Sequence, residues 1–204
     1  MGSEPSLTPP AGLMVAGLCH DGASTIVLVA PQGAAFWKLF CDSPECLDGQ
    51  QDPMDRLSKR LIGAWAAQIG AEALFPSDGP PYSPFLDWAL ASGRCWSSPM
   101  GMLVHDTQGL MISFRGALRL KGCLPLPPKA TAPCQSCAQP CRSACPANAF
   151  EKGYDTKRCH AFLDSIEGRD CMSQGCSVRR ACPISIGCGR LPEHSAWHMR
   201  QFHP

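Results

Sequence analysis

The N-terminal half of the chain shows hydrophobic patterns that predict regular secondary structure. Residues 24–30, with the sequence STIVLVA, are β-branched and apolar, which is typical of a buried strand. Residues 53–69 repeat apolar side chains at helical spacing, between Asp52 as a candidate N-cap and Gly70 as a stop signal. The apolar face of this predicted helix consists of Met54, Leu57, Leu61, Trp65 and Ile69.

Shorter segments extend this pattern along the chain. Residues 71–75 are expected to form another strand, and a proline-rich loop then leads to a second helix that ends at Gly93. Residues 101–105 and 110–115 flank a turn at residues 106–109, which predicts a β-hairpin. The buried side chains expected for the second helix are Phe85, Trp88 and Ala89.

Residues 124–133 contain four prolines and mark a predicted domain boundary. Before it we expect a flexible tail over residues 1–12 and an α+β domain over residues 13–123. Residues 124–204 show little hydrophobic periodicity, and nine of the fourteen cysteines lie there. A segment of this size buries too little apolar surface on its own, so we expect metal or covalent cross-links to stabilise it.

Composition and charge exclude several classes. Charged residues make up 17% of the chain and the formal net charge is +1, which gives no argument for binding nucleic acid or a membrane. No apolar stretch is long enough to cross a bilayer. Because no basic residue precedes Lys38, a secretory signal is not expected. We therefore expect a cytoplasmic protein whose thiols stay reduced.

The strongest chemical signal is a run of four cysteines followed by proline. Its spacing is C-x2-C-x3-C-x3-C-P, one residue longer than the C-x2-C-x2-C-x3-C-P run of bacterial ferredoxins. Three thiolates from one short loop can bind one face of an iron–sulfur cube, while the fourth cysteine reaches a neighbouring cluster. The run consists of Cys134, Cys137, Cys141, Cys145 and Pro146.

A partial internal repeat predicts a second cluster. The segment Arg142–Pro146 reads RSACP, and Arg179–Pro183 reads RRACP, 37 residues later. Counting candidate ligands gives eight cysteines, the number that two Cys-ligated 4Fe-4S clusters require. The predicted ligands of one cluster are Cys134, Cys137, Cys141 and Cys182. The predicted ligands of the other are Cys145, Cys159, Cys171 and Cys176, and Cys188 is left over.

These cysteines could instead form disulfides or bind zinc. A disulfide framework would need an oxidising compartment, for which the sequence gives no signal. Structural zinc is the stronger alternative, because Cys134-x2-Cys137 and the pair Cys141 and Cys145 could each supply two ligands. His194 and His198 would share one helical face, but their distance from Cys188 does not suit a zinc finger, so a packing or solvent-exposed role is expected.

Residues 134–183 resemble the ferredoxin-type module of epoxyqueuosine reductases. Those enzymes carry a first Cys-Pro run, a lone cysteine after basic residues and a second Cys-Pro run, which correspond here to Cys134–Pro146, Cys159 and Cys176–Pro183. The chain departs from that pattern by the extra residue before Cys141 and by the absence of a middle cysteine in the second run, for which Cys171 is the candidate substitute. The resemblance implies two 4Fe-4S clusters.

Residues 25–122 resemble part of the CblC-type cobalamin-processing family. The matching features are the strand that begins at Thr25, the Asp52–Asp55 segment at a helix start, and Gly101–Gly116 with its terminal Phe-Arg-Gly. This resemblance implies a nitroreductase-like α+β domain able to bind a corrinoid. Since no counterpart of the reductases' catalytic acid is found, tRNA is not inferred as the substrate.

Together these observations predict an iron–sulfur oxidoreductase that passes single electrons from 4Fe-4S clusters to a bound cofactor, with cobalamin as the expected cofactor. A redox protein or flavoprotein is the expected electron donor, and no membrane or nucleic-acid partner is indicated. One alternative is a simple ferredoxin-type electron carrier without its own substrate. The other is a zinc-stapled interaction protein without a redox role.

Overall fold

The computed structural model describes residues 7–204, so the first half of the predicted tail lies outside the described residues. The chain divides into two units. Unit 1 comprises Met1–Cys95 and Ser113–Ala130, and unit 2 comprises Trp96–Ile112 and Thr131–Pro204. The molecule is mixed α and β, with a small antiparallel sheet and helices, which confirms the fold class at that level. Among the described residues, no helix is both long enough and apolar enough to span a membrane.

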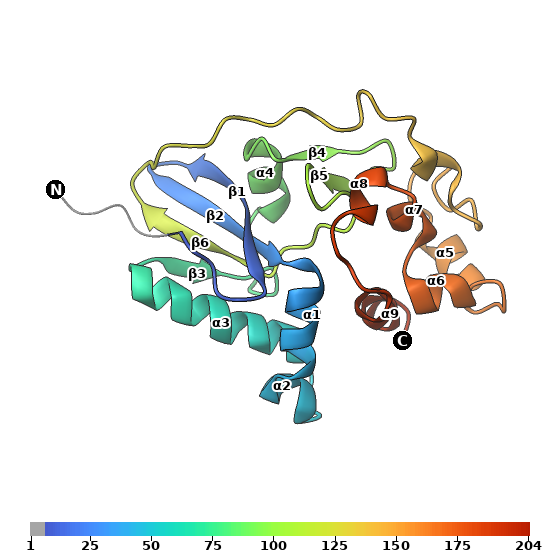
Figure 1. Ribbon diagram of the computed structural model, residues 1–204, viewed down its shortest axis with the longest axis horizontal. Helices are drawn as coiled ribbons and strands as arrows, with labels where there is room; N and C mark the ends of the chain where they lie inside the picture. The colour runs from blue at the N-terminus through green and yellow to red at the C-terminus, as the bar shows by residue number, and fades with distance from the viewer. Residues whose placement is uncertain (1–6) are drawn as a thin grey trace. The chain divides into compact units, whose positions relative to one another are not determined.

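Unit 1 is built on a four-stranded antiparallel sheet (Figure 1). The strand order is β1-β2-β6-β3, so β2 and β6 lie in the centre. Seven of the eight residues of β2 are buried, which explains why its sequence is a continuous apolar run rather than an alternating one. The strands are β1 (Leu13–Asp21), β2 (Ser24–Pro31), β3 (Glu72–Leu74) and β6 (Gly116–Lys121).

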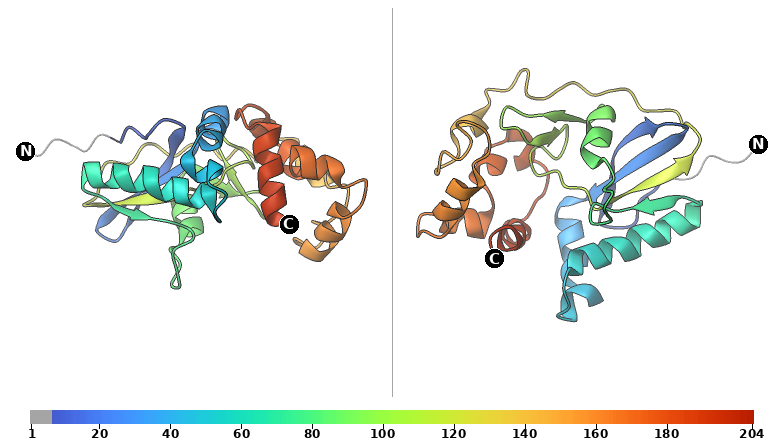
Figure 2. Two further views of the ribbon diagram at one scale, coloured as in Figure 1. Left: turned by 90° about the horizontal axis from the view of Figure 1, so that it is seen from below. Right: turned by 180° about the vertical axis from the view of Figure 1, so that it is seen from behind.

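Four helices complete unit 1. Helix α3 packs against β3 and β6, and α4 packs against β1 and β2 (Figure 2). The predicted helix 53–69 is confirmed, and it ends at Gly70 in the left-handed conformation, with φ 68°. Asp52 occupies the predicted N-cap position, but it has φ 51° and its side chain makes no capping hydrogen bond. The helices are α1 (Gly33–Cys41), α2 (Pro44–Leu47), α3 (Pro53–Ile69) and α4 (Phe85–Ala91).

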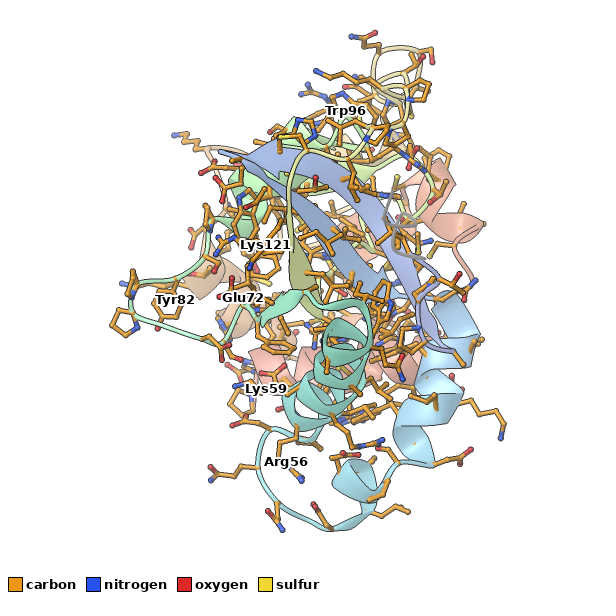
Figure 3. All side chains as sticks on the ribbon, turned by 90° about the vertical axis from the view of Figure 1, so that its left-hand side faces the viewer. Arg56, Lys59, Glu72, Tyr82, Trp96 and Lys121 are labelled. Atoms are coloured by element: carbon orange, nitrogen blue, oxygen red, sulfur yellow. The ribbon has the colours of Figure 1, made fainter. Side chains whose placement is uncertain are left out.

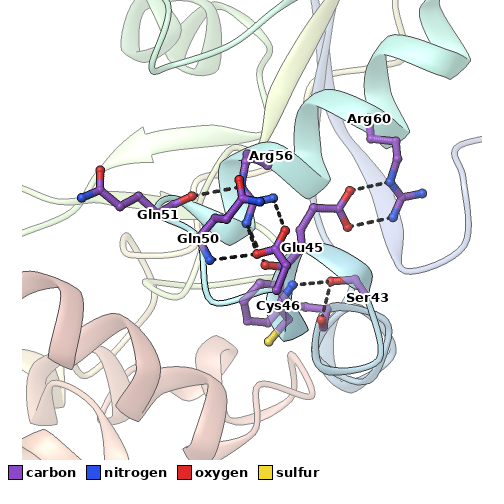
Figure 4. Close-up of polar contacts among 9 residues, drawn as sticks. Ser43, Glu45, Cys46, Gln50, Gln51, Arg56 and Arg60 are labelled. Carbon is purple, nitrogen blue, oxygen red and sulfur yellow. Dashed lines mark hydrogen bonds and ion pairs between the residues drawn. The ribbon is translucent and has the colours of Figure 1, made fainter.

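A buried carboxylate fastens α2 to α3 (Figure 4). Glu45 accepts two hydrogen bonds from Arg60, at 2.5 and 3.0 Å. Arg56 donates to the carbonyl oxygen of Glu45 over 2.9 Å and to both carboxylate oxygens of Asp48. These bonds hold the four-residue helix α2, which is too short to be stable by itself.

The loop between β3 and α4 projects away from the rest of unit 1 (Figure 2). Tyr82 lies near its tip and is 67% exposed (Figure 3). Lys59 of α3 pairs with Asp78 in this loop at 2.8 Å. The segment is proline-rich, as the sequence predicted, and it forms no helix or strand before α4 begins at Phe85.

Unit 2 is loop-rich and mostly helical, with one small two-stranded sheet. Its helices are short, and α9 packs against α6. The two strands are β4 (Cys95–Ser97) and β5 (Leu103–His105). The helical segments are η1 (Pro140–Ser143), α5 (Thr156–Leu163), α6 (Arg169–Gln174), α7 (Ser177–Arg180), α8 (Pro183–Ile186) and α9 (Pro192–Phe202).

Residues 96–112 differ from the expectation in two ways. The predicted pairing of 101–105 with 110–115 is wrong, because β5 pairs with β4 and residues 110–115 form no strand. The expected turn is present, with backbone hydrogen bonds in both directions between His105 and Gly109. The segment also belongs to unit 2, whereas the predicted boundary placed it in the first domain. Its apolar side chains cover cysteines of unit 2, which the local pattern does not reveal.

Candidate metal centre

The first group of cysteines gathers around η1 and the start of α8. Cys141 lies in η1, where Pro140 occupies the first turn, and Cys182 is the N-cap residue of α8. Both are buried, at 6% and 7% exposure, in an apolar cluster with side chains of residues 96–112. Cys134 packs against the same cluster. The buried members of the cluster besides the two cysteines are Met100, Val104, Leu110 and Val178.

The thiols of the first group lie near enough to act on one another. Burial is the largest cause that raises the pKa of Cys134, followed by its neighbours Cys141, Cys182 and Cys137. The pKa of Cys141 is likewise raised first by burial and then by Cys182. Cys134 and Cys141 thus lie within electrostatic range of each other and of Cys137 and Cys182, the other two cysteines that the sequence assigns to this cluster.

The second group comes from four different segments of unit 2. Cys145 follows η1, Cys159 lies in α5, Cys171 lies in α6, and Cys176 is the N-cap residue of α7. Helix α5 begins where the sequence predicted, because the carboxylate of Asp155 accepts a hydrogen bond from the backbone N–H of Arg158. The turns between these short helices bring the four cysteines near one another.

These four thiols also interact electrostatically. The pKa of Cys159 is raised by burial first and then by Cys176, Cys145 and Cys171. Burial is again the main cause that raises the pKa of Cys176, with a contribution from Cys171. Cys159 thus lies within electrostatic range of Cys145, Cys171 and Cys176, the other three cysteines of the second predicted set.

Hydrogen-bond donors point at several of these sulfurs. The backbone N–H of Gln139 donates to Cys137 Sγ and that of Ala149 donates to Cys145 Sγ, each over 3.3 Å. The hydroxyl of Ser177 lies 3.3 Å from Cys171 Sγ. Such donors stabilise thiolates, which are the form that binds metal.

Two arginines act on the cysteines, one on each group. Arg142 opposes the rise in the pKa of Cys141, and Arg179 does the same for Cys176. These two arginines are the first residues of the repeated segments Arg142–Pro146 and Arg179–Pro183, each of which contains a candidate ligand. Arg158 instead pairs with Glu151 at 3.6 Å, and Arg180 pairs with Asp170.

The remaining candidates lie outside both groups. Cys188 is buried, and within residues 7–204 no electrostatic contact joins it to either group. His194 and His198 share α9, as predicted, with ring centroids 5.1 Å apart, and His194 is fully buried. All fourteen cysteines are free thiols in the structure.

The donor set fits iron–sulfur clusters by its chemistry. Each group offers four thiols, and soft thiolate ligands select iron–sulfur clusters, zinc or copper(I). Among residues 7–204, no group of three or more His, Cys, Asp or Glu side chains is arranged to hold a single metal ion. Thiolates on a 4Fe-4S cluster bind different iron atoms, and so they lie further apart than thiolates that share one zinc ion.

Comparisons with known proteins give no further information about this candidate site. No protein-family model, no curated protein and no solved structure matches the chain.

Sequence reasoning missed two hydroxyl groups beside the second group. Ser177 directly follows Cys176, and Tyr154 lies five residues before Cys159 and interacts with its thiol. Neither residue type marks a metal site, so the sequence carries no signal for them. Only the turn that precedes α5 and the turn between α6 and α7 place these hydroxyls near the sulfurs.

Proposed function

We propose that this protein is an iron–sulfur oxidoreductase that binds two 4Fe-4S clusters in unit 2 and transfers single electrons. The observation that supports the proposal is that eight thiols from separate segments of the chain interact electrostatically in two sets of four. A 4Fe-4S cluster supplies one-electron chemistry at a potential set by its surroundings. In this proposal the cysteines are the ligands of the 4Fe-4S clusters, and the apolar side chains around Cys141 and Cys182 exclude water. Arg142 and Arg179 offset the negative charge of the thiolates.

The acceptor that we propose is a corrinoid bound by unit 1. This part of the proposal rests on the resemblance of residues 25–122 to the CblC-type family and on the mixed α and β architecture of unit 1. One electron leaves a reduced flavoprotein or other redox protein, and one electron lowers the oxidation state of cobalt by one. No atom is transferred, and the cofactors supply the redox chemistry while the protein positions them.

Metal analysis of anaerobically purified protein tests the cluster assignment. We expect about eight iron atoms and about eight acid-labile sulfides per chain. About four of each would restrict the proposal to one cluster. Zinc without sulfide would overturn it in favour of a zinc-stapled interaction protein.

Cobalamin titration tests the acceptor. Saturable quenching of tryptophan fluorescence is expected, and reduction of the protein should then change the visible spectrum of the bound cobalamin. If the protein contains iron and sulfide but cobalamin does not bind, a simple electron carrier without its own substrate is the remaining function. Binding without cobalt reduction would contradict electron transfer to the corrinoid.

A further inference from the structure

The two groups of cysteines differ in the donors that surround their sulfurs. In the second group, Cys171 has a side-chain hydroxyl next to it and Cys145 has a backbone N–H, each at 3.3 Å. Tyr154 lowers the pKa of Cys159, as a nearby hydrogen-bond donor does. The N–H groups of Val178 and Arg179 face Cys176. Every sulfur of the second group therefore has a donor.

The first group has backbone donors alone. The N–H of Gln139 donates to Cys137 over 3.3 Å, and the backbone N–H of Cys141 acts on its own sulfur. Within residues 7–204, no side-chain hydroxyl hydrogen-bonds a sulfur of this group. The apolar side chains that surround Cys141 and Cys182 offer no donor.

Arg180 holds the hydroxyl of Ser177 beside Cys171. Arg180 Nη2 donates to Ser177 Oγ over 3.2 Å, which occupies an oxygen lone pair. Arg180 is itself held by Asp170 and by the carbonyl oxygen of Gly175, at 2.9 Å in the latter case. A cysteine that ligates a cluster is a thiolate and has no proton, so Ser177 is the donor to Cys171 Sγ when the cluster is bound.

Tyr154 is held in place by its ring. The ring stacks on Phe150 with centroids 4.7 Å apart and an interplanar angle of 6°. Phe150 in turn packs against the apolar cluster of unit 2. The phenol interacts with the thiol of Cys159, and its O–H can donate a hydrogen bond to that sulfur.

Donors to cysteine sulfur stabilise the reduced cluster more than the oxidised one, because the reduced cluster carries one more negative charge. We propose that Ser177 and Tyr154 raise the reduction potential of the cluster on the second group above that of the cluster on the first group. An electron that enters the pair then comes to rest at the second group. This inference rests on the proposed function and adds the direction in which an electron moves between the two clusters.

Redox titration of the full chain, followed by electron paramagnetic resonance, tests this asymmetry. The two variants are Ser177→Ala and Tyr154→Phe, which delete one hydroxyl each and keep the backbone or the ring. The matched controls are Ser136→Ala and Tyr82→Phe, whose side chains are exposed and lie outside the second group. Iron and sulfide are measured on every variant.

We expect two potentials in the wild type, of which only the higher one falls in the variants. The expected shift is about a tenfold change in the ratio of oxidised to reduced cluster at fixed potential, or about 59 mV for a one-electron couple. Both controls should leave both potentials in place. Ser177→Thr keeps a hydroxyl and should retain the wild-type value.

Other outcomes contradict the inference in distinguishable ways. Clusters present with unchanged potentials, or a fall in the lower potential, would overturn the assignment of these hydroxyls while leaving the proposed function intact. Protein without iron and sulfide would overturn the proposed function itself. If one variant loses a cluster, the other variant and Ser177→Thr decide the question, since they alter different donors.

Discussion

The backbone N–H of Leu110 donates a 2.9 Å hydrogen bond to the hydroxyl of Ser185, 75 residues further along the chain. A second contact reinforces it, because Arg179 donates to the carbonyl oxygen of Leu110 over 2.5 Å. Both polar groups of one buried backbone residue are thus satisfied by the segment that carries Cys176 and Cys182. Residues 96–112 are thereby part of the framework that positions the candidate ligands.

The first prediction concerns Gly109, whose lack of a side chain allows its backbone to lie close to Ser185. A Cβ atom there would lie 2.5 Å from the backbone nitrogen of Ser185, and φ at Gly109 is +55°. Gly109→Ala should therefore destabilise unit 2 by the left-handed strain of about 1–2 kcal/mol and by overpacking of about 1–3 kcal/mol. Thermal unfolding followed by circular dichroism measures the effect.

Gly101 supplies the matched control. It also has a left-handed backbone, with φ +71°, but a Cβ atom there would meet nothing within 4 Å. Gly101→Ala should show the strain alone, about 1–2 kcal/mol. Equal destabilisation by the two variants would show that the contact with Ser185 does not constrain the fold.

The second prediction distinguishes the assigned metal ligands from Cys188, a buried cysteine that is not assigned as a ligand. Cys137→Ser should lower the iron content from about eight to about four atoms per chain and destabilise unit 2, because metal ligation supplies folding free energy. Cys188→Ser should leave iron and sulfide unchanged, although its side chain is only 8% exposed. Loss of iron in Cys188→Ser together with its retention in Cys171→Ser would mean that the eighth ligand is misassigned.

The third prediction concerns the carboxylate between α2 and α3. The hydrogen bond with Arg60 is the largest cause that lowers the pKa of Glu45 below its ordinary value of 4.5. The ionised carboxylate therefore stabilises the fold above that value, and this contribution is lost as the pH falls through the lowered pKa. Glu45→Gln should cost about 1 kcal/mol at neutral pH. In acid the difference from the wild type should disappear.

Urea unfolding at a series of pH values measures this difference. Asp42→Asn serves as the control, because the pair between Asp42 and Lys38 is exposed on both sides and contributes little. A Glu45→Gln deficit that stays constant down to the acid limit would show that lost packing, rather than lost charge, explains it.

The fourth prediction is alkaline destabilisation through Cys19. Burial, with a smaller contribution from Asp21, raises the pKa of Cys19 from 9.0 to about 11. The folded protein holds this proton more tightly than the unfolded chain, so its contribution is complete below pH 9 and is lost as the pH rises to about 11. Two pKa units correspond to about 2.7 kcal/mol.

The comparison with Cys19→Ala isolates this residue from the other thiols. The alanine variant loses packing at every pH, but its deficit relative to the wild type should shrink between pH 8 and pH 10.5. Urea unfolding at both pH values reports the change in free energy. A constant deficit across that range would contradict the assigned pKa.

Elements with a strong local signal could be predicted from the sequence. The apolar run of β2 and the helical periodicity of α3 define both elements, and Gly70 marks the end of α3. Strand β1 gives no such signal, since a bulge between Val15 and Gly17 interrupts its alternation. Helix α1 also lacks a start signal, because Gln32 makes no side-chain capping bond.

In the candidate site, too, features with a local sequence pattern could be predicted, whereas contacts between distant segments could not. The Cys-Pro repeat and the count of eight cysteines predict two ligand sets, and both the sets and cluster binding stay predictions. The contact between Leu110 and Ser185 and the hydroxyls of Ser177 and Tyr154 could not be predicted. They depend on turns that bring together segments whose sequences carry no mutual pattern.

The two units alternate along the chain, and this determines the order in which their parts are synthesised. Unit 1 receives its last strand, β6, only after residues 96–112 have emerged. During that interval Met100, Val104 and Leu110 lack much of their cover, because the other buried residues of their cluster are Cys141, Val178 and Cys182. The nascent chain thus carries an exposed apolar segment from residue 112 until Cys182 is synthesised, which makes that interval of translation the one most open to aggregation or chaperone capture.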